Sequence, residues 1–201
     1  MPPDWVHNEH DVVWDEVGDW ADWGSGIVSR KHSLSEVKID TGFRGAMMIA
    51  ESAFTPDVEI TLVSMYGLFE RIGGIGYTTP NLHRMLSDLT GLLDGRTHGD
   101  RNFILGGDLN ASLQFDETYA DESRIFFERL EAFGLTNCFE PFYDDYVQTF
   151  RHNTSEGEWQ IDYVFISDNL TDNLESCEVL DNQHVRKYSD HNPALITLDL
   201  G

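Results

Sequence analysis

Short apolar runs bounded by turn residues occupy the first third of the chain. They cover residues 24–29, 34–39 and 45–51, and a longer run rich in β-favouring residues covers 59–66. We expect the first three to be consecutive antiparallel strands and the fourth to be a strand that ends at Tyr66. Ahead of them, the stretch around 11–14 predicts at most a short strand.

Two later segments have the apolar spacing of amphipathic helices. Residues 79–93 begin with Thr79-Pro80 and carry leucine or methionine at helical intervals, and residues 123–133 repeat the pattern and stop at Gly134. Strands are predicted around these helices, at 103–110, 160–166, 178–180 and 194–200. With 201 residues and no linker-like segment, the chain is predicted to form one domain, residues 1–201.

The charge of the chain is strongly one-sided. There are 36 acidic and 13 basic residues, which gives a formal net charge of −23. An acidic surface either repels nucleic acid or keeps a protein soluble in concentrated salt, where charges are screened. Because an aspartate-rich, lysine-poor composition resembles that of salt-loving organisms, we favour a halophilic protein. The charge therefore does not exclude a nucleic-acid substrate.

The cysteines and the apolar runs give no sign of export or of a membrane. Cys138 and Cys177 lack metal-ligand or redox spacing and are predicted to be core thiols. No basic start followed by an apolar stretch is present, and no apolar run approaches the ~20 residues that span a bilayer. We expect a cytoplasmic protein with no membrane partner.

The most informative stretch is 103–110, Phe-Ile-Leu-Gly-Gly-Asp-Leu-Asn. Because side chains alternate along a strand, Asp108 and Asn110 should share one face at the strand's end. A carboxylate and an amide oxygen there suit a hard divalent cation, Mg²⁺ or Mn²⁺, and the phosphate that it polarises. The same residues are also ordinary turn formers, so an Asx-type turn remains the alternative.

Two later stretches offer groups that complete a site. Asp162 lies within an apolar strand, where a carboxylate is costly unless it is paired, and Asp190-His191 lies in a polar turn before the last strand. The natural partner of Asp162 is His191. Together with the pair at 108 and 110, these groups suit metal-assisted hydrolysis of a phosphate ester.

These stretches resemble the endonuclease/exonuclease/phosphatase superfamily of metal-dependent phosphoesterases, which includes apurinic endonucleases and pancreatic deoxyribonuclease. The matching residues are 106–110 (Gly-Gly-Asp-Leu-Asn), 161–165 (Ile-Asp-Tyr-Val-Phe) and 189–191 (Ser-Asp-His), in the family's order, with 64–66 (Ser-Met-Tyr) at the family's strand that ends in Tyr or His. The resemblance runs from about Trp23 to the end of the chain.

The resemblance implies an α+β fold, a four-layer α/β/β/α sandwich of two mostly antiparallel sheets flanked by helices. It also implies a Mg²⁺- or Mn²⁺-dependent phosphodiesterase or phosphatase, with a nuclease as one form. The resemblance implies that Asp108 orients the attacking water and that Asn110, Tyr66 and His191 contact the phosphate. It also implies that Asp162 supports the histidine, and that Asp190 and Asp108 lie at the metal.

One departure from the family pattern matters. The family begins with a strand bearing Asn and a strand ending in Gln-Glu, whose glutamate is the principal metal ligand, and this sequence has neither. Glu9 and Glu16 are weak substitutes because they lie in no apolar strand. A chain without those strands would leave a sheet edge open and pair with a second copy. The alternative function is a catalytically silent or truncated member that binds a partner.

The stretch from Cys138 to Glu158 is irregular and rich in aromatic residues. A long loop of this kind either lines a site or covers the edge of the core. The aromatic residues could stack on bases or pack internally. The substrate class, whether nucleic acid, lipid or inositol phosphate, therefore stays open at this level.

Overall fold

A six-stranded sheet forms the centre of the protein, in the order β3-β4-β5-β8-β10-β9. The computed structural model describes residues 10–16, 24–72, 75–94, 101–115, 117–152, 154 and 156–201. The strands are β3 (Ser35–Glu36), β4 (Met47–Thr55), β5 (Val58–Met65), β8 (Asn102–Asp108), β9 (Leu135–Asn137) and β10 (Asp162–Ser167). β5 and β8 are parallel, and the other neighbouring strands are antiparallel.

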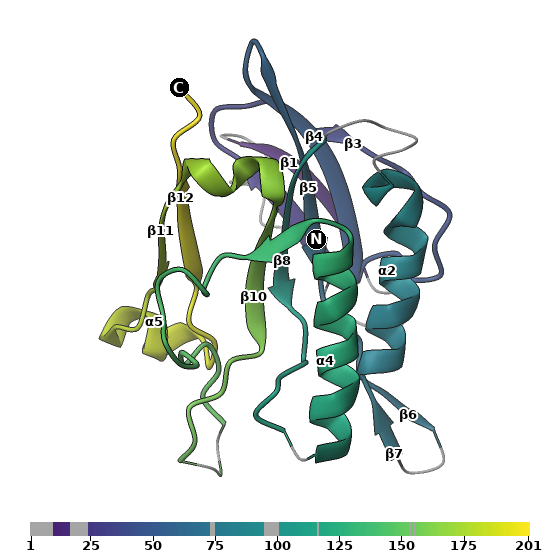
Figure 1. Ribbon diagram of the computed structural model, residues 1–201, viewed down its shortest axis with the longest axis vertical. Helices are drawn as coiled ribbons and strands as arrows, with labels where there is room; N and C mark the ends of the chain where they lie inside the picture. Colours follow the sequence, from purple (N-terminus) through teal and green to yellow (C-terminus); the bar gives the residue numbers. More distant parts are fainter. Residues whose placement is uncertain are drawn as a thin grey trace.

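Two helices cover one face of this sheet, α2 (Thr79–Leu93) and α4 (Glu117–Ala132) (Figure 1). The leucines and methionine of α2 that recur at helical spacing are buried, and Phe126 and Leu130 of α4 are fully buried beside them. They pack on Leu105, Tyr163 and Phe165 of the central strands in the main hydrophobic core. Burial of this apolar stripe holds the helices against the sheet.

Two β-hairpins pack on the other face. The first pairs β1 (Asp11–Glu16) with β2 (Gly24–Ser29), and its Val13 meets Met48 and Ala50 of β4. The second pairs β11 (Leu174–Val179) with β12 (Ala194–Leu198), and its Cys177 packs in a cluster with Cys138 and Ile166. Helix layer, central sheet and hairpin layer together confirm the predicted α+β class.

The remaining elements are short connections. A small hairpin joins β6 (Glu70–Ile72) and β7 (Ile75–Tyr77), a 3-10 turn η1 (Asp168–Asn173) leads into β11, and α5 (Gln183–Tyr188) precedes the last strand. Within the described part of the chain, no helix is long and apolar enough to cross a membrane.

The predicted elements agree with the structure except at their ends. The 79–93 helix has the predicted bounds, whereas α4 begins six positions before the predicted 123 and the predicted strand 34–39 shrinks to β3. The runs 24–29 and 34–39 do not pair with each other, because β2 pairs with β1 and β3 pairs with β4. The apolar pattern had predicted one antiparallel series, and the structure divides it between two sheets.

Candidate active site

The site is created by the pairing of β8 with β10. Their antiparallel register places Asp162 directly opposite Asp108, at the carboxyl end of β8 and the amino end of β10. Ligand atoms of Asp108, Asp162 and His191 all lie within 4.8 Å of one another. Three residues that are 29 to 83 positions apart in the sequence thus form one compact group of oxygen and nitrogen ligands.

The end of β8 is shaped by its glycine and asparagine residues. Gly107 has a φ of 149°, and a side chain there would collide with the Met65 carbonyl oxygen at 2.0 Å, so only glycine lets β5 and β8 approach at this point. Asn110 has a φ of 47°, a left-handed conformation that asparagine tolerates. The chain therefore turns sharply just after Asp108.

This turn, rather than strand alternation, brings Asp108 and Asn110 together. The Asp108 Oδ1 atom accepts a hydrogen bond from the Asn110 backbone N–H at 2.9 Å, and Asn110 Nδ2 lies 3.3 Å from Asp108 Oδ2. Asn110 Nδ2 also donates to the Gly67 carbonyl at 3.1 Å. The Asx-type turn and the polar pair that the sequence offered as alternatives are one and the same structure.

Tyr66 lies beside this turn, one residue past the end of β5. Burial raises the pKa of its hydroxyl, and the nearby Asp108 carboxylate adds to the increase. A hydrogen bond with the Asn110 side chain partly offsets both effects. The Tyr66 hydroxyl thus stays protonated at neutral pH and remains a hydrogen-bond donor.

His191 is oriented by Asp162. The His191 Nδ1 atom lies 2.9 Å from Asp162 Oδ2, and its Nε2 atom lies 3.9 Å from Asp108 Oδ2. The hydrogen bond to Asp162 raises the pKa of His191, while partial burial works against it. The Asp162 carboxylate holds the proton on Nδ1 of His191. The other ring nitrogen, Nε2, faces Asp108 and is the one available to a substrate.

The charged form of the Asp108 carboxylate is destabilised by its surroundings. Burial, together with the neighbouring Asp162 and Asp190 carboxylates, raises its pKa to about 6, and the hydrogen bond from the Asn110 N–H only partly offsets this. A buried carboxylate beside two others is costly when charged. A divalent cation would relieve this cost, so the donor set fits a hard metal ion.

The other candidate metal ligands lie differently. Asp190 is exposed, and it falls outside the group of three, although its charge reaches both Asp108 and His191. Glu16 is exposed at the end of β1 and also lies outside that group, and Glu9 is outside the described residues.

The turn that carries His191 is fixed by Thr149 and Arg151. Thr149 is fully buried, and its carbonyl accepts a hydrogen bond from the Asn192 N–H at 2.7 Å. The Arg151 guanidinium contacts the Asn192 side chain and the Ser189 carbonyl, and its backbone N–H donates to the Asp190 carbonyl at 2.8 Å. The segment 149–151, Thr-Phe-Arg, forms no recognisable local motif, so only the tertiary structure identifies these supporting roles.

An aromatic pocket of about 310 Å³ adjoins the cluster. Its lining includes Asn110, Phe115, Phe150, His152 and Trp159. The Phe150 ring lies 4.8 Å from the His191 ring, and the Phe115 and Trp159 rings lie 5.7 Å apart. Part of the irregular aromatic loop therefore lines the site.

Comparison with known proteins agrees with this geometry. The model of the Endonuclease/Exonuclease/phosphatase family matches residues 5–191. No curated protein sequence matches the chain.

Several solved structures share the fold at low sequence identity. An AP endonuclease from Archaeoglobus fulgidus superposes with a TM-score of 0.74 and 17% identity, over 100% of this chain and 84% of that one. The 3′-5′ exonuclease NExo from Neisseria meningitidis superposes with a TM-score of 0.69 and 18% identity, over 99% of this chain and 84% of that one. The endonuclease domain of TRAS1, a telomere-specific non-LTR retrotransposon, superposes with a TM-score of 0.67 and 21% identity, over 96% of this chain and 81% of that one.

Proposed function

The chain belongs to the endonuclease/exonuclease/phosphatase family, and from this membership we propose that it is a divalent-metal-dependent phosphodiesterase that hydrolyses nucleic acid. The observation that carries the proposal is the group formed by Asp108, Asp162 and His191, whose ligand atoms lie within 4.8 Å of one another. Carboxylates and an imidazole in this arrangement are the groups that hydrolysis of a phosphate ester needs.

Mg²⁺ or Mn²⁺ is the proposed cofactor. Asp108 and Asp190 would hold the ion, since Asp162 is already engaged with His191. When bound, the ion supplies Lewis-acid stabilisation of the charge that develops on the phosphate oxygens. The raised pKa of Asp108 supports this assignment, because a carboxylate that is costly to ionise alone gains most from a cation.

The protein's own residues have complementary roles in this proposal. Asp108 accepts a proton from, or orients, the water that attacks phosphorus, and His191 contacts a phosphate oxygen through Nε2 while Asp162 holds its ring. Asn110 and Tyr66 present an amide and a hydroxyl to the phosphate from the adjacent turn. The attack breaks the bond between phosphorus and the leaving oxygen and gives a phosphomonoester and an alcohol.

The aromatic pocket favours nucleic acid over other phosphate esters. It shares Asn110 with the phosphate site, so it would receive the group attached to the scissile phosphate. Rings such as Phe115, Phe150 and Trp159 suit the flat, apolar face of a base or a sugar. The solved structures of similar fold include a NExo variant bound to a product DNA hairpin. The acidic surface makes concentrated salt the natural assay condition.

The test is hydrolysis of single- and double-stranded DNA and of bis(p-nitrophenyl) phosphate in concentrated KCl, with Mg²⁺ or Mn²⁺ and with EDTA. We expect metal-dependent activity that Asp108→Ala and His191→Ala abolish, and that the matched exposed variants Asp172→Ala and His184→Ala retain. A preference for DNA over the small diester supports the nucleic-acid assignment. If no metal gives activity above the Asp108→Ala variant, the proposal fails and the silent, partner-binding alternative takes its place.

A further inference from the structure

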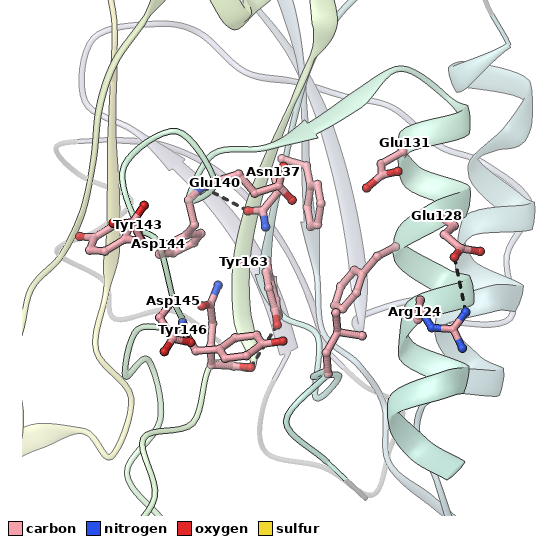
Figure 2. A pocket seen from close by; sticks show the side chains of 15 residues that line it. Arg124, Glu128, Glu131, Asn137, Glu140, Tyr143, Asp144, Asp145, Tyr146 and Tyr163 are labelled. Carbon is pink, nitrogen blue, oxygen red and sulfur yellow. Dashed lines mark hydrogen bonds and ion pairs between the residues drawn. The ribbon is translucent and has the colours of Figure 1, made fainter. Parts of the chain in front are cut away.

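A second cavity lies away from the catalytic cluster. It has a volume of about 520 Å³, within the range of small-molecule sites, and it opens between α4 and the loop 138–146 (Figure 2). Tyr163 and Phe165 of β10 line its floor. Because side chains alternate along β10, these two point to the helix face, opposite to Asp162. The cavity and the catalytic group therefore lie on different faces of the same strand.

The lining of this cavity combines aromatic rings with polar side chains. The Phe127 ring of α4 lies 4.9 Å from the Tyr163 ring, and the Phe139 ring lies 6.0 Å from the Tyr143 ring. Tyr146 closes the lower end, as Figure 2 shows. Rings from a helix, a strand and a loop thus surround one space. Phe139, Tyr163 and Phe165 are almost fully buried, so the aromatic surface that a guest can reach belongs mainly to Phe127, Tyr143 and Tyr146.

The mouth of the cavity is acidic on both sides. Glu128 and Glu131 stand on the α4 side, and Glu140, Asp144 and Asp145 stand on the loop side (Figure 2). The one basic residue of the lining, Arg124, is already paired with Asp121 and with Glu128 at 3.5 Å. Within the described part of the chain, Glu131, Glu140, Asp144 and Asp145 have no ion-pair partner.

We propose that this cavity is a binding site for a small organic cation of the alkylammonium class. The aromatic enclosure selects a guest with an apolar body and a weakly hydrated charge, and the free carboxylates at both rims supply the opposite charge. An inorganic cation lacks the apolar surface that the rings would cover. A nucleotide or another anion would meet several unpaired carboxylates at the mouth. The proposal is independent of the catalytic function, because it uses none of the catalytic residues.

The probe for the test is choline, and its matched control is 3,3-dimethyl-1-butanol, which has the same shape and hydroxyl but no charge. Binding is measured by saturation-transfer NMR on the full chain in EDTA, at the lowest KCl concentration at which circular dichroism shows a folded protein. We expect choline to bind in the millimolar range and the neutral isostere to bind about fivefold or more weakly, since cation–π attraction provides the difference. The Asp108→Ala variant should bind choline like the parent chain.

Two variant pairs locate the site. Tyr146→Leu should weaken choline binding about two- to fivefold, whereas Tyr146→Phe, which keeps the ring, should not. The exposed rim pair Glu140→Gln with Asp144→Asn should weaken binding by a similar factor, whereas Asp172→Asn with Glu175→Gln, which removes the same charge elsewhere, should not. Equal binding of choline and its isostere, equal effects of the rim and control pairs, or no choline binding at all would each overturn the proposal.

Discussion

The buried hydroxyl oxygen of Thr149 accepts a hydrogen bond from the Asp162 backbone N–H at 3.1 Å. The same oxygen also accepts from the Ile161 N–H at 3.0 Å, and the Thr149 carbonyl accepts from the Asn192 N–H at 2.7 Å. One residue thus joins the start of β10, which carries Asp162, to the turn that carries His191. Thr149 positions the Asp162–His191 pair through these backbone hydrogen bonds.

Replacement of Thr149 by valine should uncouple these two segments. Valine has the same shape but no acceptor, so the Ile161 and Asp162 N–H groups would be buried without a partner. We expect the free energy of unfolding to fall by about 1–3 kcal/mol and kcat to fall about tenfold or more with little change in KM. Urea unfolding and steady-state kinetics with the preferred substrate measure the two effects.

Thr149→Ser is the matched control for this substitution, since it keeps the oxygen and loses only a methyl group. It should recover most of the kcat that Thr149→Val loses. A valine variant with the turnover of the parent chain would show that the hydroxyl does not position the pair.

The helices illustrate how far local patterns determine the fold. The 79–93 helix was predicted with its correct bounds because proline marks its start and five buried apolar residues follow at helical spacing. The first turns of α4 were missed because residues 117–122 are mostly polar and give no apolar period. α5 was missed because none of its six residues is buried, although Asn182 caps it by accepting from the His184 and Val185 N–H groups.

The residues of the site also divide into those that the sequence could identify and those that it could not. Asp108, Asn110, Asp162 and His191 could be named from the sequence because their chemistry is unusual at strand ends and inside apolar strands. The supporting roles of Thr149 and Arg151 could not, because both residues act through backbone groups 12 to 43 positions away, and such pairings depend on tertiary structure. Asp190 as a metal ligand stays a prediction, since its neighbour His191 joins the group of ligand atoms and Asp190 lies outside it.

Self-association through an open sheet edge is the second prediction. Among the described strands, β12 is hydrogen-bonded only to β11, and Leu195 of β12 is 49% exposed. An exposed edge with apolar side chains favours pairing with another copy. Light scattering after size exclusion should give a mass of about two 22.9 kDa chains, and Leu195→Lys should shift the mass toward one chain. A parent protein with the mass of a single chain would rule out the homodimer.

The third prediction concerns the thiols. Burial raises the pKa of Cys138 to about 12, with Cys177 adding to the increase, and burial raises the pKa of Cys177 to about 11. Because the thiolate is the reactive form, iodoacetamide at about pH 8 should modify neither cysteine in the folded protein and both in urea, as counted by mass spectrometry. The protonated thiols contribute stability below the unfolded pKa near 9, and this contribution is lost as the pH rises toward 11 to 12. Rapid labelling of the folded protein would contradict the burial of this cluster.

The last prediction is that Asp108 destabilises the metal-free protein. Its pKa is about 6 in the folded protein and 3.8 as an ordinary carboxyl, so folding favours the protonated form. The stability that protonation provides is complete below pH 3.8 and is lost as the pH rises through about 6. At about pH 7 in EDTA, Asp108→Asn should therefore raise the free energy of unfolding, by up to about 3 kcal/mol.

Urea unfolding of the parent chain and of Asp108→Asn across this pH range tests the sign of the effect. The gain from Asp108→Asn should shrink as the pH falls and vanish well below pH 3.8, where Asp108 is neutral in both the folded and the unfolded state. Asp190→Asn is the control, because Asp190 is exposed and should change stability far less. Mg²⁺ should stabilise the parent chain more than Asp108→Asn, since the ion offsets the charge that the substitution removes. The opposite result is a parent chain that is more stable than Asp108→Asn at neutral pH without metal. It would mean that other groups of the protein already compensate the charge of the Asp108 carboxylate. The electrostatic argument for a cation at this site would then fail.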